Sequence, residues 1–127
     1  MRTGVAFILI IDDEFSVAEV VEAILTDAGH EVVTASNGRQ GLERAKEKRP
    51  DLVLLDFMMP IMGGPSTIKA LRKEPGLRDI PVVVMSSLPE ASVSQSAKGD
   101  YVAFLRKPFR IRDVLDVVSG ALSGDHG

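Results

Sequence analysis

The chain has 127 residues, 45% of them hydrophobic, and a formal net charge of −3 at pH 7. This length suits one domain with a single core, and the hydrophobic fraction argues against a disordered chain. The small negative charge argues against a broad basic field of the kind that binds nucleic acid. Because the sequence contains no cysteine, disulfides and thiolate metal sites are excluded, and we expect a reducing compartment, the cytoplasm.

Apolar runs and apolar stripes alternate along the chain. Short apolar runs are typical of strands buried on both faces, and apolar residues at helical spacing indicate amphipathic helices. The longest run, Val5–Ile11, is too short to span a bilayer, so no contact with a membrane is expected. In chain order we predict a strand at Val5–Ile11, a helix over 17–28 capped by Gly29, a strand at His30–Thr34, a weaker helix between Asn37 and Pro50, a strand at Asp51–Asp56, a helix from Pro65 to Pro75, a strand at Ile80–Met85, a strand at Tyr101–Leu105 and a helix over 111–118.

Two stretches near the carboxyl end are less regular. Ala91–Gly99 is rich in serine and has only a thin apolar stripe, so we expect a short or mobile helix there. Ser119–Gly127 is small and polar and is expected to be a tail, with the core extending over residues 5–122. Since no repeat or interdomain linker is visible, residues 1–127 are expected to form one domain.

Strands and helices alternate five times, which predicts an α/β fold. Right-handed crossovers would place helices on both faces of a five-stranded parallel sheet. In such a sheet the residues that follow the strands gather at one edge, where ligands bind. The residues predicted at this edge are Asp12 and Asp13 after the first strand, Asp56 after the third, Ser86 after the fourth and Lys107 after the fifth.

These residue types suit phosphoryl transfer. Neighbouring carboxylates repel one another, and Mg²⁺, which prefers oxygen ligands, relieves that repulsion. A carboxylate such as Asp56 can also be a nucleophile that forms an aspartyl-phosphate. The Lys107 ammonium and the Ser86 hydroxyl can then stabilise charge on the transferring phosphoryl oxygens.

Each of these residues also has an ordinary structural explanation. Asp12 and Asp13 could simply cap the first helix, because acids favour helix N-termini. Asp56 and Ser86 could be turn residues, and Lys107 could be a solvated surface lysine. The functional interpretation therefore depends on all of them reaching the same edge of the sheet.

The motifs ILIIDDE, LVLLDFMMP, PVVVMSS and FLRKPF together resemble the receiver domain of two-component response regulators. Their order and spacing match over nearly the whole chain. The resemblance implies a flavodoxin-like (βα)5 fold and a phosphorylation-dependent signalling switch. It implies that a sensor histidine kinase or phosphotransfer protein donates a phosphoryl group to Asp56. A downstream effector protein would respond, and this domain itself would not contact nucleic acid.

The resemblance also implies how the metal is held. Asp13, Asp56 and the backbone carbonyl of Met58 would bind Mg²⁺ directly. Asp12 would contribute through a metal-bound water. On this basis Mg²⁺ is the expected cofactor, and the chain is not expected to be an enzyme beyond its own phosphorylation and dephosphorylation.

A switch mechanism follows from the same resemblance. Ser86 matches the position of the family's switch serine or threonine, and Lys107 matches its lysine. Phe104 lies where the family has an aromatic residue that turns inward on activation. Ser86 would move toward the new phosphoryl oxygens, Phe104 would rotate into the vacated space, and the surface of the fourth helix, fifth strand and fifth helix would change.

The sequence departs from the family pattern at two positions in the loop after Asp56. Gly63 stands where the family often has aspartate. Met58 occupies a position whose side chain can screen attacking water, and an apolar residue there cannot orient water. We therefore hypothesise slow autodephosphorylation.

Three other functions are compatible with parts of the sequence to different degrees. A receiver fold used as a phosphorylation-independent interaction module would suit the weak Ala91–Gly99 helix. A phosphohydrolase of the haloacid-dehalogenase type would need an acid two residues after its nucleophile, and Met58 cannot move a proton. Dinucleotide binding is disfavoured because no glycine-rich turn follows the first strand.

Overall fold

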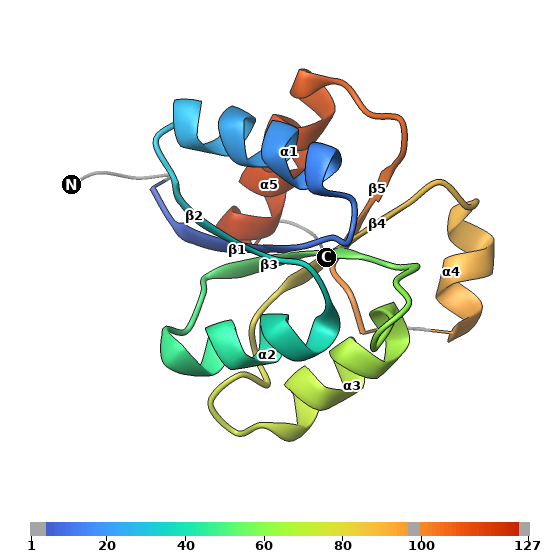
Figure 1. Ribbon diagram of the computed structural model, residues 1–127. Coiled ribbons are helices and arrows are strands. Elements are labelled where there is room, and N and C mark those ends of the chain that lie inside the picture. The colour runs from blue at the N-terminus through green and yellow to red at the C-terminus, as the bar shows by residue number, and fades with distance from the viewer. Residues whose placement is uncertain (1–4, 97–99, 125–127) are drawn as a thin grey trace.

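The computed structural model describes residues 5–96 and 100–124 and shows a central sheet with helices on both faces (Figure 1). The sheet has five parallel strands in the order β2-β1-β3-β4-β5, which confirms the predicted α/β class and the flavodoxin-like arrangement. The strands are β1 (Phe7–Ile11), β2 (Glu31–Ala35), β3 (Leu52–Asp56), β4 (Val82–Ser86) and β5 (Ala103–Arg106). The helices are α1 (Phe15–Asp27), α2 (Gly38–Glu47), α3 (Gly64–Lys73), α4 (Glu90–Ser96) and α5 (Ile111–Ser123).

The central strands are apolar throughout because helices cover both of their faces. Every residue of β3 and of β4 is buried. The strands β1 and β3 pair in register from Ile8 with Leu52 to Ile11 with Leu55. This register brings the carboxyl ends of the strands to one level, which is where the site is expected.

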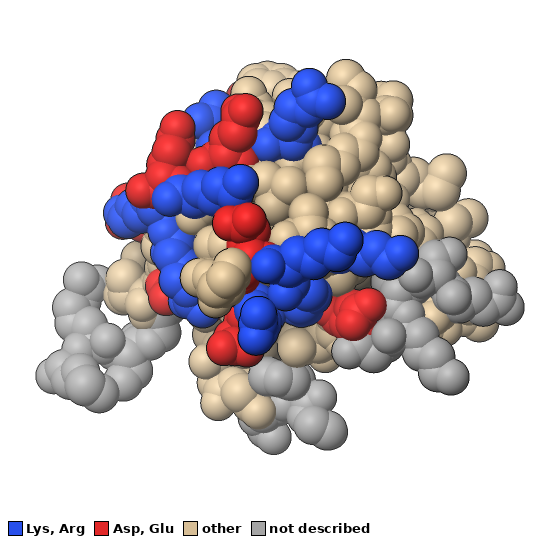
Figure 2. Space-filling view, turned by 90° about the horizontal axis from the view of Figure 1, so that it is seen from below, with Lys and Arg blue, Asp and Glu red and all other residues tan. Residues whose placement is uncertain are grey.

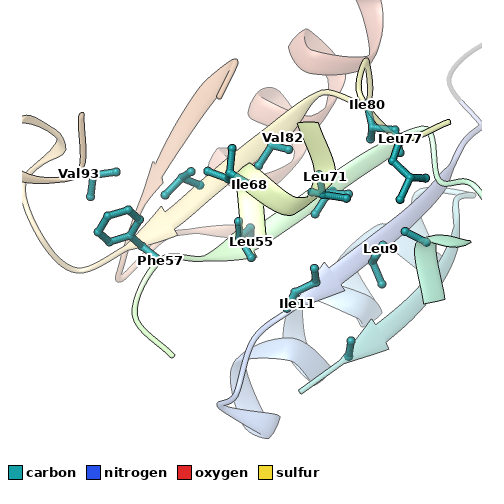
Figure 3. Close-up of a cluster of buried hydrophobic side chains, with 14 residues drawn as sticks. Leu9, Ile11, Leu55, Phe57, Ile68, Leu71, Leu77, Ile80, Val82 and Val93 are labelled. Carbon is teal, nitrogen blue, oxygen red and sulfur yellow. The ribbon is translucent and has the colours of Figure 1, made fainter. Parts of the chain in front are cut away.

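Side chains of each strand alternate between two hydrophobic clusters, one on each face of the sheet. Leu9 and Leu55 point toward α2 and α3, where they meet Ile68 and Leu71 in the cluster drawn in Figure 3, which lies below the sheet in the view of Figure 1. The cluster above the sheet packs against α1 and α5, and it contains Ile8, Ile10, Leu52, Leu54, Val21, Leu25, Val114 and Val118. The two-sided burial explains why the strand sequences are continuous apolar runs rather than alternating ones.

Two predicted helix boundaries are confirmed. Gly29 follows the end of α1 with φ +99°, a left-handed conformation that glycine adopts without the cost of a Cβ. Pro65 lies in the first turn of α3, where the missing N–H costs no hydrogen bond.

The predicted tail at Ser119–Gly127 is wrong for its first residues. Residues 119–123 form the end of α5, and Ala121 is buried against the sheet. Val114, Val118 and Ala121 lie at helical spacing, so the apolar stripe continues past Val118 through a small residue. The helix ends only at Gly124, whose φ is +78°.

The segment Ala91–Gly99 contains the shortest helix among the described residues. The helix α4 has seven residues, which confirms a short helix over Glu90–Ser96, while residues 97–99 of the predicted segment lie outside the described ranges. Val93 is buried in the cluster below the sheet and attaches α4 to it (Figure 3). Across residues 5–96 and 100–124, no helix is both long and apolar enough to cross a membrane.

Candidate functional site

The structure gathers the predicted site residues at the carboxyl edge of the sheet. Asp12 directly follows β1, Asp56 is the last residue of β3 and Ser86 is the last residue of β4. Lys107 directly follows β5. These positions come from four different strands, so the site depends on the strand order and register rather than on any local motif.

Three carboxylates form a compact acidic cluster at this edge. Oxygens of Asp12, Asp13 and Asp56 all lie within 4.8 Å of one another. Asp12 and Asp56 are buried, whereas Asp13 is exposed. A set of oxygen donors with one side open to solvent fits Mg²⁺, which takes carboxylates and keeps several waters.

Lys107 is the cation that faces this cluster. Its Nζ lies 3.3 Å from Asp12 Oδ2, 3.3 Å from Asp56 Oδ1 and 3.1 Å from Glu14 Oε1. The Lys107 side chain is only 15% exposed, so water screens these contacts weakly. The explanation of Lys107 as a solvated surface lysine therefore does not hold.

Glu14 is a site residue that was not predicted from the sequence. Its carboxylate accepts a hydrogen bond from Lys107, although its side chain is 59% exposed. The signal was the third acid of the run Asp12-Asp13-Glu14. That run also resembles an ordinary acidic start of a helix, so the sequence could not separate the two roles.

The pKa of Asp56 is raised from its ordinary value to about 7. Burial is the main cause, and the charge of Asp12 and a hydrogen bond with Asp13 act in the same direction. Lys107 opposes them through its charge and its hydrogen bond. For the carboxyl that the sequence predicts as nucleophile, burial and the neighbouring acids thus raise the pKa by more than Lys107 lowers it.

The pKa of Lys107 is also raised. Burial lowers it, but the hydrogen bond to Glu14 and the charges of Asp12 and Asp56 outweigh that effect. Lys107 is therefore a permanent cation at neutral pH, as a residue that stabilises phosphoryl oxygens must be.

Asp12 also stabilises the local backbone. Its Oδ1 accepts a hydrogen bond from the Glu14 N–H at 2.9 Å, just before α1. The N-cap residue of α1 is Glu14, whose own side chain makes no capping hydrogen bond. Helix capping by Asp12 does not account for its second oxygen, which contacts Lys107, or for the place of Asp13 in the acidic cluster.

Ser86 and Phe104 lie on the neighbouring strands β4 and β5. Met85 pairs with Asp56 in the sheet, so Ser86 is one residue beyond the predicted phosphoacceptor. The buried Ser86 Oγ accepts a hydrogen bond from the Leu88 N–H at 3.0 Å. Phe104 pairs with Val84 and packs against the cluster below the sheet. Ser86 lies at the carboxyl edge of the sheet, as expected, while the switch role and movement of both residues stay predictions.

Met58 begins the loop that leaves the site. Its side chain is 63% exposed. No described residue donates a hydrogen bond to its backbone carbonyl. That carbonyl is thus available as a metal ligand, the role that the resemblance implies.

Comparisons with known proteins agree with this arrangement. A family model described as the response regulator receiver domain matches residues 8–119. A probable transcriptional regulator, ycf27, from Porphyra purpurea is 39% identical over 119 residues, covering 85% of this chain and 46% of the relative. The DNA-binding response regulator MtrA from Mycobacterium leprae is 31% identical, covering 91% of this chain and 50% of the relative. The chain thus spans about half the length of these curated relatives.

Solved structures show the same architecture. The chemotaxis protein CheY4 from Vibrio cholerae superposes with a TM-score of 0.88 at 31% identity, covering 94% of this chain and 100% of that one. The signal receiver domain of a signal transduction histidine kinase from Syntrophus aciditrophicus has a TM-score of 0.84 at 32% identity, covering 94% and 91% of the two chains.

Proposed function

The chain belongs to the response regulator receiver domain family, and we propose that it is a signalling switch whose phosphoacceptor is Asp56. The observation that carries the proposal is the contact of Lys107 with Asp12 and Asp56 at 3.3 Å, inside a cluster of three carboxylates. Four strands bring these residues together, and each has a distinct use in phosphoryl transfer.

The proposed reaction uses a carboxylate oxygen of Asp56 as the nucleophile. This oxygen forms a bond to the phosphorus of the donor while the bond between phosphorus and the donor's histidine nitrogen breaks. The electron pair of the broken bond stays on that nitrogen. Lys107 and Ser86 stabilise the negative charge on the phosphoryl oxygens by charge and by hydrogen bonding.

We propose that Asp13, Asp56 and the Met58 carbonyl hold Mg²⁺, with Asp12 acting through a bound water. When bound, the ion neutralises carboxylate repulsion and the charge of the phosphoryl group. The open side at Asp13 leaves room for a donor to approach. The only reactions proposed for this chain are the phosphorylation and dephosphorylation of its own Asp56.

The donor is proposed to be a sensor histidine kinase or a phosphotransfer protein. Such a partner must place its phosphoryl group at Asp56 and therefore has to contact the surface beside it. An open groove of about 520 Å³ lies next to Lys107 and is lined by Val17, Val20 and Phe109 among others. Its apolar lining suits side chains of a protein partner better than a free ion.

Phosphorylation is proposed to act through Ser86 and Phe104. Adding about −1.5 to −2 charge and three acceptor oxygens favours a state in which the Ser86 hydroxyl turns toward them. Phe104 could then rotate, and the surface of α4, β5 and α5 would change for a downstream effector protein.

The surface charges agree with a protein partner rather than nucleic acid. On the face shown in Figure 2, acidic side chains lie between the basic ones. The net charge of −3 adds no basic field. We accordingly propose that this domain does not itself contact nucleic acid. The cytoplasm is proposed as its compartment because the sequence has no cysteine.

The test is incubation with acetyl phosphate and Mg²⁺, followed by intact-mass spectrometry. We expect the wild-type protein to gain one phosphoryl group and Asp56→Asn to gain none. The matched control is Asp27→Asn, which changes an exposed aspartate at the end of α1 and should be labelled like the wild type. Equal labelling of Asp56→Asn would show that the acceptor lies elsewhere.

The short α4 supports the alternative of a phosphorylation-independent interaction module, because Val93 is the only buried residue among residues 90–94, the part of this helix whose burial is described. In that case an effector would bind the Asp56→Asn variant as tightly as the phosphorylated wild type. The complete acidic cluster with its lysine favours the phosphorylated switch.

A further inference from the structure

The two ends of the loop between β3 and α3 lie in direct backbone contact at Gly64, a position where no side chain fits. The Gly64 N–H donates a hydrogen bond to the Phe57 carbonyl at 2.9 Å. A Cβ on Gly64 would lie 2.9 Å from both the Cα and the carbonyl oxygen of Phe57. The first turn of α3 therefore rests directly on the start of the loop that contains Met58.

Thr67 ties down the far end of the same loop. Its fully buried Oγ1 lies 3.1 Å from the Met62 carbonyl oxygen and 2.8 Å from the Gly63 carbonyl oxygen, so the single hydroxyl hydrogen is shared between two consecutive carbonyls. Met62 has φ +59°, a conformation that residues with a side chain adopt only when surrounding contacts hold it.

The first turn of α2 presses on this loop from the other side. The Gly38 N–H donates a hydrogen bond to the Ile61 carbonyl at 3.4 Å. A Cβ on Gly38 would lie 2.5 Å from the Met62 carbonyl and would also collide with Thr67 Oγ1. Only glycine fits at position 38. The space is this narrow because α2 and α3 lie side by side below the sheet (Figure 1).

These contacts occupy the carbonyls of Phe57, Ile61, Met62 and Gly63, while no described residue donates a hydrogen bond to the carbonyls of Met58, Met59 or Pro60 between them. We propose that Thr67 and Gly38 are positioning residues for the magnesium site, which hold this loop so that the Met58 carbonyl stays in place as a ligand. The inference rests on the proposed function and names residues that touch neither the metal nor the phosphoryl group.

The Thr67 hydroxyl contacts also stabilise the end of the loop at Gly63, where α3 begins. With glycine as the N-cap residue of α3, no side chain caps that helix. Without such a cap, the loop lacks the hydrogen bond that an N-cap side chain makes to the first turn of the helix. The Thr67 hydroxyl, one turn into α3, supplies a fixed point from inside the helix.

The first test measures Mg²⁺ affinity of the full chain by titration calorimetry. Thr67→Val removes the hydroxyl at nearly constant volume, and we expect Mg²⁺ to bind roughly tenfold more weakly, as for other residues that orient a ligand. Thr67→Ser keeps the hydroxyl and should restore affinity to within about twofold. Ser66→Ala, an exposed neighbour in the same turn, should not change it.

A second readout separates positioning from general damage. At saturating Mg²⁺, the rate of labelling by acetyl phosphate should be within about twofold of wild type in Thr67→Val, because the loop is then held by the ion. Gly38→Ala should weaken Mg²⁺ binding in the same way. Gly76→Ala, where an added Cβ meets nothing within 4 Å, is the matched glycine control.

The outcomes distinguish this inference from the proposed function. If the wild type binds Mg²⁺ and both Thr67→Val and Gly38→Ala bind it equally well, the inference is overturned and the proposed function stands. Failure of Thr67→Ser to restore affinity would also overturn it. If the wild type binds no Mg²⁺, the proposed function fails together with the inference. Should one variant not fold, the other still decides the question.

Discussion

Asp56 is a buried carboxyl among like charges, and this should make the metal-free protein sensitive to pH. Its pKa is raised from 3.8 to about 7 by burial first and then by Asp12. Between these values the folded state binds more protons than the unfolded chain. The free energy of unfolding therefore falls as pH rises through this window. The stability contributed by the protonated Asp56 carboxyl is fully present only below pH 3.8.

Asp56→Asn removes this titration. In urea denaturation with EDTA, the variant should be more stable than the wild type at pH 8, and the difference should shrink at pH 5. Adding Mg²⁺ at pH 8 should stabilise the wild type more than the variant, because the ion relieves the repulsion at Asp56. A difference between the two proteins that is the same at both pH values would contradict the raised pKa.

Lys107 should contribute more stability than a surface lysine with a shorter ion pair. Lys107→Ala leaves two buried carboxylates without their cation, and we expect the metal-free protein to lose about 3 kcal/mol of unfolding free energy. Lys48→Ala breaks a pair with Glu31 at 2.8 Å in which both side chains are exposed, and should cost less than about 1 kcal/mol. Urea denaturation at pH 7 measures both, and equal losses would argue against a structural role for the buried position of Lys107.

Met58 should set the lifetime of the phosphorylated state. Its side chain is exposed beside the site and cannot hydrogen-bond an attacking water. Met58→Asn introduces an amide that can orient water, so the phosphoryl group should be lost several-fold faster. The measurement is the decay of the phosphorylated mass after the donor is removed, and an unchanged half-life would refute the hypothesis. Exchanging the exposed Ile61 for Asn in the same loop provides the control.

At the scale of elements, the strands were the most predictable part of the chain. The strands β3 and β4 are buried on both faces, so every residue is apolar up to the polar residue at the edge of the sheet. The end of each run therefore also located Asp56 and Ser86. Boundaries at the other ends were less certain, because residues before β1 and β4 remain apolar outside the paired region.

Features that depend on tertiary contacts could not be predicted. Glu14 contributes only because β5 delivers Lys107 next to it. The role of Thr67 requires α2 and α3 to lie side by side, and no local pattern encodes that contact. The same limit applied to the end of α5, where the small and polar residues from Ser119 onward predicted a tail although the helix continues to Ser123.

The extended α5 makes a direct prediction. Ala121 is buried beside Val118 in the cluster above the sheet, so Ala121→Asp should place a charge in an apolar environment and destabilise the protein by about 2 to 3 kcal/mol. Ser119→Asp, on the exposed side of the same turn, should change stability by less than about 0.5 kcal/mol. Thermal denaturation compares them, and equal effects would mean that this turn of α5 is not packed in solution.

At the scale of the whole molecule, one sheet edge connects two parts of the proposed switch. The strand order places the acidic cluster of β1 and β3 beside β4 and β5, which carry Ser86 and Phe104. In the proposed switch, a change in charge at Asp56 would reach the surface of α5 and α4 through these two adjacent strands. This chain spans about half the length of relatives described as a probable transcriptional regulator and as a DNA-binding response regulator.

The central claim is that residues from four strands form one metal-dependent phosphoacceptor site. The most direct measurement is mass-spectrometric location of the phosphoryl group after acetyl phosphate treatment, across a Mg²⁺ titration. The account predicts that the label appears on the peptide containing Asp56, grows with Mg²⁺ and is absent in EDTA. Label on another residue, or equal labelling of Asp56 with and without divalent metal, would contradict it.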